Sequence, residues 1–187
     1  CSRNKRTFIM ANSNKDNYTD IPKNYQKFVL VQSPHAISKD YGYEEEDVIY
    51  LLNLIKYEPN NEKLEDDDIQ NDLGCFFNDG VCVERNIELA KYWFAKSADQ
   101  GNDLARSNLA DIYRKGTDGS EVNLKKSLDL YKACGLPYAH YRCGEFYEKG
   151  WGVDKNIEEA KRYYSLAYLE GHPLAKKKLK EWNFLED

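Results

Sequence analysis

Apolar residues recur at helical spacing in two neighbouring segments of residues 147–164, "YEKGWGVDKNIEEAKRYY". Gly150 follows the first segment, and glycine closes helices because it readily accepts a left-handed backbone. Asn156 precedes the second segment and suits an N-cap, since its side chain can accept a hydrogen bond from a free amide of the first turn. A helix hairpin is predicted, and the apolar residues on one face of its second helix are Ile157, Ala160, Tyr163 and Tyr164.

The same order of residues occurs three times along the chain, at intervals of 34 to 36 residues. A hairpin cannot bury its apolar face alone, so repeated hairpins stack on one another. The predicted units are 69–104, 105–138 and 139–174, followed by a terminal helix at 175–183, and together they form a repeat region over 69–187. The apolar position in the middle of each first helix is expected to point into the core, and it holds Leu73, Leu109 and Cys143.

The turn "GWGV", the second helix "EEAKRYY" and the link "SADQGNDLA" resemble the Sel-like repeat (SLR) family, helical-hairpin relatives of tetratricopeptide repeats. The second unit fits less well, because Ser127 stands where the other units have alanine. The resemblance implies an all-α, right-handed α-solenoid of about three SLR hairpins that acts as a binding scaffold and has no chemistry of its own. Any function inferred in this way is an analogy of fold.

The first part of the chain follows no repeat. Residues 1–24 are polar and rich in asparagine, which is typical of an extended or flexible leader. Residues 25–68 are predicted to cap the first repeat with one helix in "YEEEDVIYLLNLIKYE", which has acidic residues in its first turn and one apolar side. The preceding run "KFVLVQ" fits either a strand or a buried extended segment.

Composition and charge narrow the class of partner. With 41% apolar residues the chain has enough material for a core, and it has no run of roughly 20 apolar residues that could span a bilayer. The net charge of −5 argues against nucleic acid, which requires a clustered positive surface. A protein is therefore the expected partner.

The sequence begins with Cys1-Ser2, which looks like the start of a mature bacterial lipoprotein with a lipid on Cys1. This reading predicts a periplasmic, lipid-anchored protein. The alternative is that the sequence is part of a longer, cytoplasmic chain.

Four further cysteines form an even set, and in an oxidising compartment they would form two disulfides. Proximity in the sequence favours the pairs Cys75 with Cys82 and Cys134 with Cys143. The alternative is four small buried thiols.

Motifs for catalysis, cofactors and metals are absent from the sequence. It contains no HExxH, GxSxG, P-loop or dinucleotide glycine motif, and it has no CxxC pair that would bind zinc. We therefore predict a protein that is not an enzyme and that has no cofactor.

The partner is expected to bind on the concave side, which the first helices line in related solenoids. Helical geometry places the groove-facing residues two before, two after, and five or six after the apolar position of each first helix. In the first unit they are Asn71, Asn78 and Asp79; in the second, Ser107, Asp111, Arg114 and Lys115; in the third, Tyr141, Glu145, Glu148 and Lys149. Arg114 and Tyr141 are predicted to make the strongest contacts.

Two functions agree with these features. The more concrete is a periplasmic immunity protein that binds and occludes a toxic effector from a rival cell, as some SLR lipoproteins do. The alternative is an intracellular adaptor that assembles a protein complex.

Overall fold

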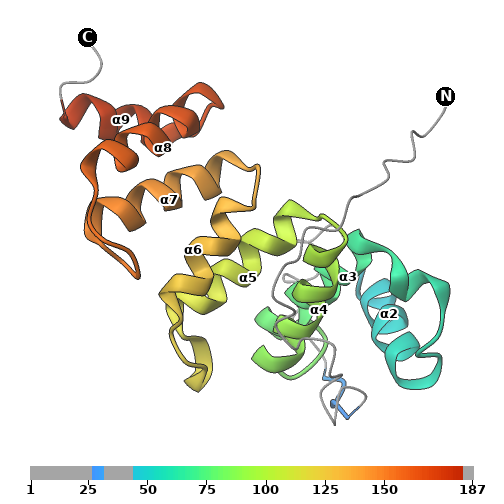
Figure 1. Ribbon diagram of the computed structural model, residues 1–187. Helices are drawn as coiled ribbons and strands as arrows, with labels where there is room; N and C mark the ends of the chain where they lie inside the picture. The colour runs from blue at the N-terminus through green and yellow to red at the C-terminus, as the bar shows by residue number, and fades with distance from the viewer. Residues whose placement is uncertain (1–26, 32–43, 183–187) are drawn as a thin grey trace, which may run out of the picture.

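The computed structural model describes residues 27–31 and 44–182, and this part of the chain is all-α (Figure 1). The helices succeed one another from α2 at one end of the molecule to α9 at the other, with α5 and α6 between them (Figure 1). The predicted all-α solenoid is therefore confirmed. The α-helices are α2 (Glu45–Tyr57), α3 (Asp67–Asp79), α4 (Ile87–Asp99), α5 (Asp103–Lys115), α6 (Leu124–Lys132), α7 (Pro137–Lys149), α8 (Ile157–Leu169) and α9 (Pro173–Glu181), and the short 3-10 helices are η1 (Glu62–Glu65) and η2 (Thr117–Gly119).

The hairpins begin and end at the residues that the sequence pattern indicates. Gly150 ends α7 in the left-handed conformation, with φ of 71°, and its amide bonds to the carbonyl of Phe146. The Asn156 side chain accepts a hydrogen bond from the amide of Glu159 and so starts α8. The other two hairpins use the same devices, and their residues are Gly80 and Asn86 in the first and Gly116 and Asn123 in the second.

The core lies between the first and second helices of the stacked hairpins. Leu73, Leu109 and Cys143 are all buried, as predicted for the apolar position of each first helix. The largest apolar cluster joins α2, α3, α4 and part of α5, and two smaller clusters lie under α6 to α9. Successive hairpins thus bury one another's apolar faces, which is how repeat proteins gain stability.

Each outer hairpin needs a glycine where its two helices meet. A Cβ added to Gly74 on α3 would lie 2.4 Å from the Phe94 ring of α4, and one added to Gly144 on α7 would lie 2.7 Å from the Tyr164 ring of α8. Here glycine is required for close approach rather than for an unusual backbone conformation.

The region before the first repeat forms the predicted cap. Helix α2 buries Val48, Leu52 and Ile55, and Leu64 of η1 is also buried, although the sequence pattern had indicated one helix only. Residues 27–31 are extended and form an isolated antiparallel bridge between Leu30 and Val83. The predicted leader, residues 1–24, lies outside the described residues.

The terminal helix begins two residues earlier than predicted, because Pro173 occupies the first position of α9, where proline is well tolerated. Ala175 and Leu179 of α9 are buried. Trp182 packs edge-on against the Tyr164 ring, with centroids 5.5 Å apart, so it covers the final hairpin as predicted.

Within the described part of the chain the predicted disulfides, Cys75 with Cys82 and Cys134 with Cys143, are not formed. The Cys134 thiol lies 3.3 Å from the Asp103 carbonyl oxygen and donates a hydrogen bond to it. Cys143 is fully buried at the position that holds leucine in the first two units. Cys82, Cys134 and Cys143 are buried and Cys75 is partly buried, which agrees with the alternative of small buried thiols for three of the four.

Candidate protein-binding face

Polar side chains join the first helices of successive units. Asn108 of α5 donates a hydrogen bond to Asn71 of α3 over 3.1 Å. The Tyr138 hydroxyl of α7 donates to Asp111 of α5 over 2.9 Å. Because these contacts place the first helices side by side, we call the surface formed by α3, α5, α7 and α9 the first-helix face; a third contact, between Lys178 of α9 and Glu148 of α7, extends it.

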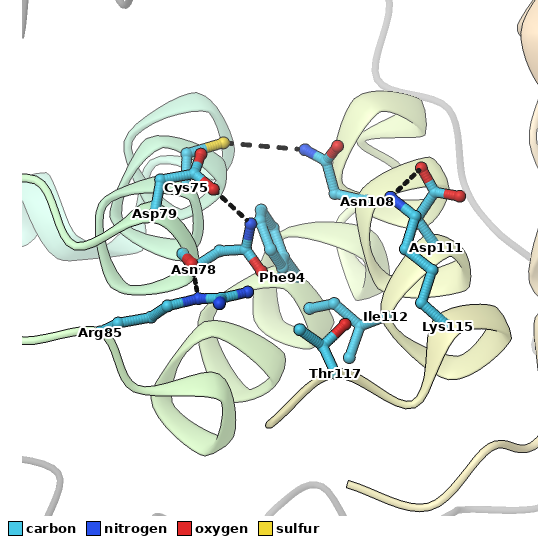
Figure 2. Close-up of a pocket in the computed structure, with 10 residues that line it drawn as sticks. All are labelled: Cys75, Asn78, Asp79, Arg85, Phe94, Asn108, Asp111, Ile112, Lys115 and Thr117. Carbon is cyan, nitrogen blue, oxygen red and sulfur yellow. Dashed lines mark hydrogen bonds and ion pairs between the residues drawn. The ribbon is translucent and has the colours of Figure 1, made fainter. Parts of the chain in front are cut away.

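A cavity of about 420 Å³ lies on this face between the first two hairpins, and we call it the α3–α5 pocket (Figure 2). Its apolar part comes from Phe94 of α4 and Ile112 of α5, with the Cys75 thiol beside them. The remaining residues are polar or charged. They are Asn78 and Asp79 of α3, Arg85 of the following turn, Asn108, Asp111 and Lys115 of α5, and Thr117.

Charges of both signs surround the pocket. Asp79 and Lys115 are exposed on opposite helices, and Asn78 donates a hydrogen bond to Asp79 over 2.7 Å. Arg85 is held by a hydrogen bond from its Nε to the Asn78 carbonyl oxygen (Figure 2). The pocket is therefore mostly polar, with a small apolar patch at Phe94 and Ile112, and protein interfaces likewise combine apolar contacts with a polar rim.

Asp111 lies where the pocket meets the third unit, and both of its carboxylate oxygens accept hydrogen bonds from neighbouring side chains. Its Oδ1 accepts hydrogen bonds from Arg114 over 2.8 Å and from the Tyr131 hydroxyl over 2.7 Å, while its Oδ2 accepts one from Tyr138. Burial acts to raise the pKa of Asp111, but these hydrogen bonds outweigh it and lower the pKa below its ordinary value.

The predicted residues of the third unit form a separate group. Glu145 pairs with Arg142 over 2.6 Å, and it also lies 3.6 Å from Lys149. Glu148 accepts hydrogen bonds from the Tyr164 hydroxyl over 2.5 Å and from Lys178 over 2.9 Å. None of these side chains lines the α3–α5 pocket.

Three of the predicted groove residues are buried, which corrects their expected exposure. Asn71, Ser107 and Tyr141 are only 7 to 8% exposed. The position two before the apolar residue is covered by neighbouring helices rather than open to solvent. Asn71 accepts its hydrogen bond from Asn108, and the Tyr141 ring stacks on His172 with centroids 4.4 Å apart.

Arg114 is also less available than the sequence indicated, because its guanidinium already bonds to Asp111 and the Tyr131 hydroxyl. Five pocket residues had not been identified as site residues, and they are Arg85, Phe94, Asn108, Ile112 and Thr117. Asn108 follows one of the predicted positions on α5, and Arg85 lies in a turn that helical periodicity does not describe. The only sequence feature that could have indicated Arg85 as a site residue was its charge just before the Asn86 helix cap.

The Cys75 thiol of the pocket is kept in its neutral form. Burial, together with the nearby carboxylates of Asp72 and Asp79, raises the pKa of the Cys75 thiol to about 12, so it is protonated at neutral pH and is a poor nucleophile. Among residues 27–31 and 44–182, no cluster of side chains could hold a metal ion, and no helix is long and apolar enough to cross a membrane.

Comparison with known proteins identifies the family to which the repeats belong. The Sel1 repeat matches residues 69–102, 104–133 and 137–172, which together make up more than half of the chain. Chitin synthase regulatory factor 3 of Schizosaccharomyces pombe is 32% identical over 94 residues, or 48% of this chain and 10% of that protein. A putative sel1-like repeat-containing protein of Acanthamoeba polyphaga mimivirus is 30% identical over 105 residues, or 54% of this chain and 18% of that protein.

Two solved structures share the fold. A Sel1 repeat protein from Oxalobacter formigenes is 30% identical and superimposes with a TM-score of 0.60 over 73% of this chain and 99% of that protein. A protective antigen of uropathogenic Escherichia coli with an SLR fold gives a TM-score of 0.61 at 24% identity, covering 64% of this chain and 26% of the antigen chain. The repeats, the hairpin caps and these similarities agree, and the chain belongs to the Sel1 repeat family.

Proposed function

We propose that the chain is a non-catalytic scaffold that binds another protein through the first-helix face, with the α3–α5 pocket at the centre of the contact. The observation that carries this proposal is the combination of the apolar Phe94 and Ile112 with a rim that bears Asp79 and Lys115. Such a site can admit one apolar side chain of a partner while the rim pairs with polar groups around it. Contacts of this kind supply most of the free energy of protein binding.

The test replaces two rim residues that no apolar cluster includes. In the double variant Asn78→Ala with Lys115→Ala, we expect affinity for the partner to fall by about 2 kcal/mol, or roughly 30-fold in Kd, without a change in melting temperature. The partner would first be identified by co-purification and mass spectrometry and then titrated as a pure protein. The matched control, Glu158→Ala with Lys161→Ala, removes an ion pair from α8. A loss of affinity in the control alone would show that the partner binds elsewhere.

We further propose that the partner is a toxic effector and that the chain is a lipid-anchored periplasmic immunity protein. Binding would occlude the effector's working surface, a mechanism that needs no catalytic group on the scaffold. In the test, the candidate effector is expressed in the periplasm of a sensitive strain. We expect growth to be restored by the wild-type chain and not by the Asn78→Ala, Lys115→Ala variant. Equal protection by both would contradict the role of the pocket.

Similarity to chitin synthase regulatory factor 3 supports the second proposal, an intracellular adaptor that assembles a complex through the same face. The two proposals differ in location. A lipid-anchored protein fractionates with membranes and incorporates labelled palmitate, and Cys1→Ser abolishes both properties. A chain that remains in the cytoplasmic fraction, without label, would favour the adaptor.

A further inference from the structure

The chain's own residues 27–31 show how an extended segment binds to a hairpin turn of this fold. The Val31 amide donates a hydrogen bond to the Cys82 carbonyl oxygen over 3.1 Å, and the Glu84 amide donates to the Val29 carbonyl oxygen over 3.3 Å. These two bonds form an isolated antiparallel β-bridge, the shortest form of the pairing by which an extended peptide adds to a backbone edge. The first hairpin turn therefore has a backbone edge that accepts an extended peptide.

The side chains of the segment alternate, as those of a bound strand do. Phe28 is buried and packs edge-on against Phe77, with centroids 5.2 Å apart. Leu30 packs against the core, whereas Val29 and Val31 are exposed. Specificity at this turn thus comes from two apolar side chains separated by one residue.

The turn of the third hairpin has the same construction. "GVCVERN" at 80–86 corresponds to "GWGVDKN" at 150–156. Positive φ angles occur at the same two positions, 74° and 54° for Gly80 and Cys82 against 71° and 63° for Gly150 and Gly152. Both turns also close with the same two backbone hydrogen bonds, from Val81 to Phe76 and from Asn86 to Phe77 in the first, and from Trp151 to Phe146 and from Asn156 to Tyr147 in the third.

Gly152 of the third turn packs against the start of α6, where an added Cβ would lie 2.8 Å from the Leu124 side chain. The backbone edge of this turn, however, unlike that of the first, is uncovered within the described part of the chain. Val83 is 1% exposed, whereas its counterpart Val153 is only half-buried, and Gly152 and Asp154 are exposed. The Gly152 carbonyl and the Asp154 amide, which correspond to the bonding groups of Cys82 and Glu84, have no hydrogen-bond partner among the described residues. The α7–α8 connection projects from the body of the molecule (Figure 1).

Lysines surround this uncovered edge. Lys155 lies in the turn and is exposed, and Lys149 lies over the Trp151 ring with its ammonium 4.2 Å from the ring centroid. Lys125 is also exposed, and its backbone nitrogen would lie 2.9 Å from a Cβ added to Gly152. Asp154 is the only acidic residue of the turn. The field near the edge therefore favours a segment with acidic residues.

We propose that residues 150–155 form a second binding site, which accepts an extended, acidic segment of a partner protein by strand addition. The segment places two apolar side chains, one residue apart, against the half-buried Val153 and Tyr147. Its backbone donates a hydrogen bond to the Gly152 carbonyl and accepts one from the Asp154 amide. The site is separate from the α3–α5 pocket and rests on the proposed function only in taking the ligand to be a protein.

The test uses a synthetic peptide that carries the sequence of residues 27–31 between two pairs of glutamates, titrated into the isotope-labelled chain and followed by NMR. We expect amide shifts at 151–155 and weaker binding when lysines replace the glutamates. A peptide methylated on the nitrogen that corresponds to Val31 loses its donor and should bind about tenfold more weakly. Methylation at the position of Leu30, whose amide points away from the edge, is the matched control.

Three results would overturn the proposal. They are no shift up to the solubility limit of the peptide, equal binding of both methylated peptides, or shifts confined to the first turn or to the α3–α5 pocket. Because the methyl groups are on the peptide, the protein fold is unchanged in every measurement. Shifts confined to the pocket would leave the proposed function intact while excluding the turn.

Discussion

Asp111 is a single residue whose hydrogen bonds join two neighbouring units. Its carboxylate accepts hydrogen bonds within α5 from Arg114, from Tyr131 of α6, and from Tyr138 of α7. A partly buried carboxylate is costly unless it is fully bonded, and here nearly all of its acceptor capacity is used. Asp111 therefore stabilises the junction between the second and third hairpins, although it also lines the α3–α5 pocket.

We expect Asp111→Asn to lower the free energy of unfolding at neutral pH by about 2 kcal/mol, because it weakens charge-assisted hydrogen bonds at a buried site. The folded state has the lowered pKa. The stabilisation is therefore fully present above the ordinary value of 3.8 and is lost as the pH falls through the folded value. Urea titrations across this acidic range should show a smaller pH dependence for the variant. Asp129→Asn, at an exposed position of α6, should match the wild type.

The cysteines give a second prediction for single residues. Burial raises the pKa of Cys75 and of Cys143 to about 12, so neither forms a reactive thiolate at moderate pH. We expect iodoacetamide to modify both very slowly in the folded chain and rapidly in urea, with mass spectrometry locating the label. If the thiols remain unmodified in urea until a reductant is added, the predicted disulfides are present after all.

At the scale of elements, local signals in the sequence predicted the helices well. The glycine and asparagine of each turn and the apolar position of each first helix are short-range features, and the structure confirms them. The exposure of the groove residues was predicted less accurately. Helical geometry placed Tyr141 in the exposed groove, but its exposure depends on His172 at the start of α9, which no pattern within one helix can locate.

The contact between paired helices can be tested at Gly74. Although alanine favours helix formation, we expect Gly74→Ala to destabilise the chain by ~1–3 kcal/mol, because the new methyl group would overlap the Phe94 ring. Adding Phe94→Leu should relieve the overlap. The double variant should then be less destabilised than the sum of the two single variants, as measured by denaturant unfolding. Simple additivity would show that the helices do not meet as closely as the structure indicates.

For the whole molecule, the sequence predicted the solenoid but only part of the candidate site. Asn78, Asp79, Asp111 and Lys115 do meet in one pocket, because equivalent positions on stacked helices become neighbours. Arg85 and Phe94 also line the pocket, but they were not predicted, because they lie in a turn and in a second helix, whereas the prediction considered only first helices. The network around Asp111 joins residues 20 and 27 positions apart, so it follows from the stacking of units rather than from any one of them.

The apolar core is uneven along the solenoid, and its stability should be uneven too. One large cluster joins α2 to α5, whereas two small clusters support α6 to α9. Repeat proteins can open one part at a time where the coupling between neighbouring units is weak. We therefore expect native-state hydrogen exchange to be faster in α7, α8 and α9 than in α3 and α4.

Asp111 contributes to the coupling between the two parts, so Asp111→Asn should widen this difference. Exchange in α7 to α9 should become faster while α3 and α4 keep nearly their original protection, because the lost bonds to Tyr131 and Tyr138 lie at the junction. Glu148→Gln provides the comparison: it weakens the bonds to Tyr164 and Lys178 and should loosen α9 and leave the junction intact. Uniform acceleration across all helices in the Asp111 variant would mean that the solenoid opens as a single cooperative unit.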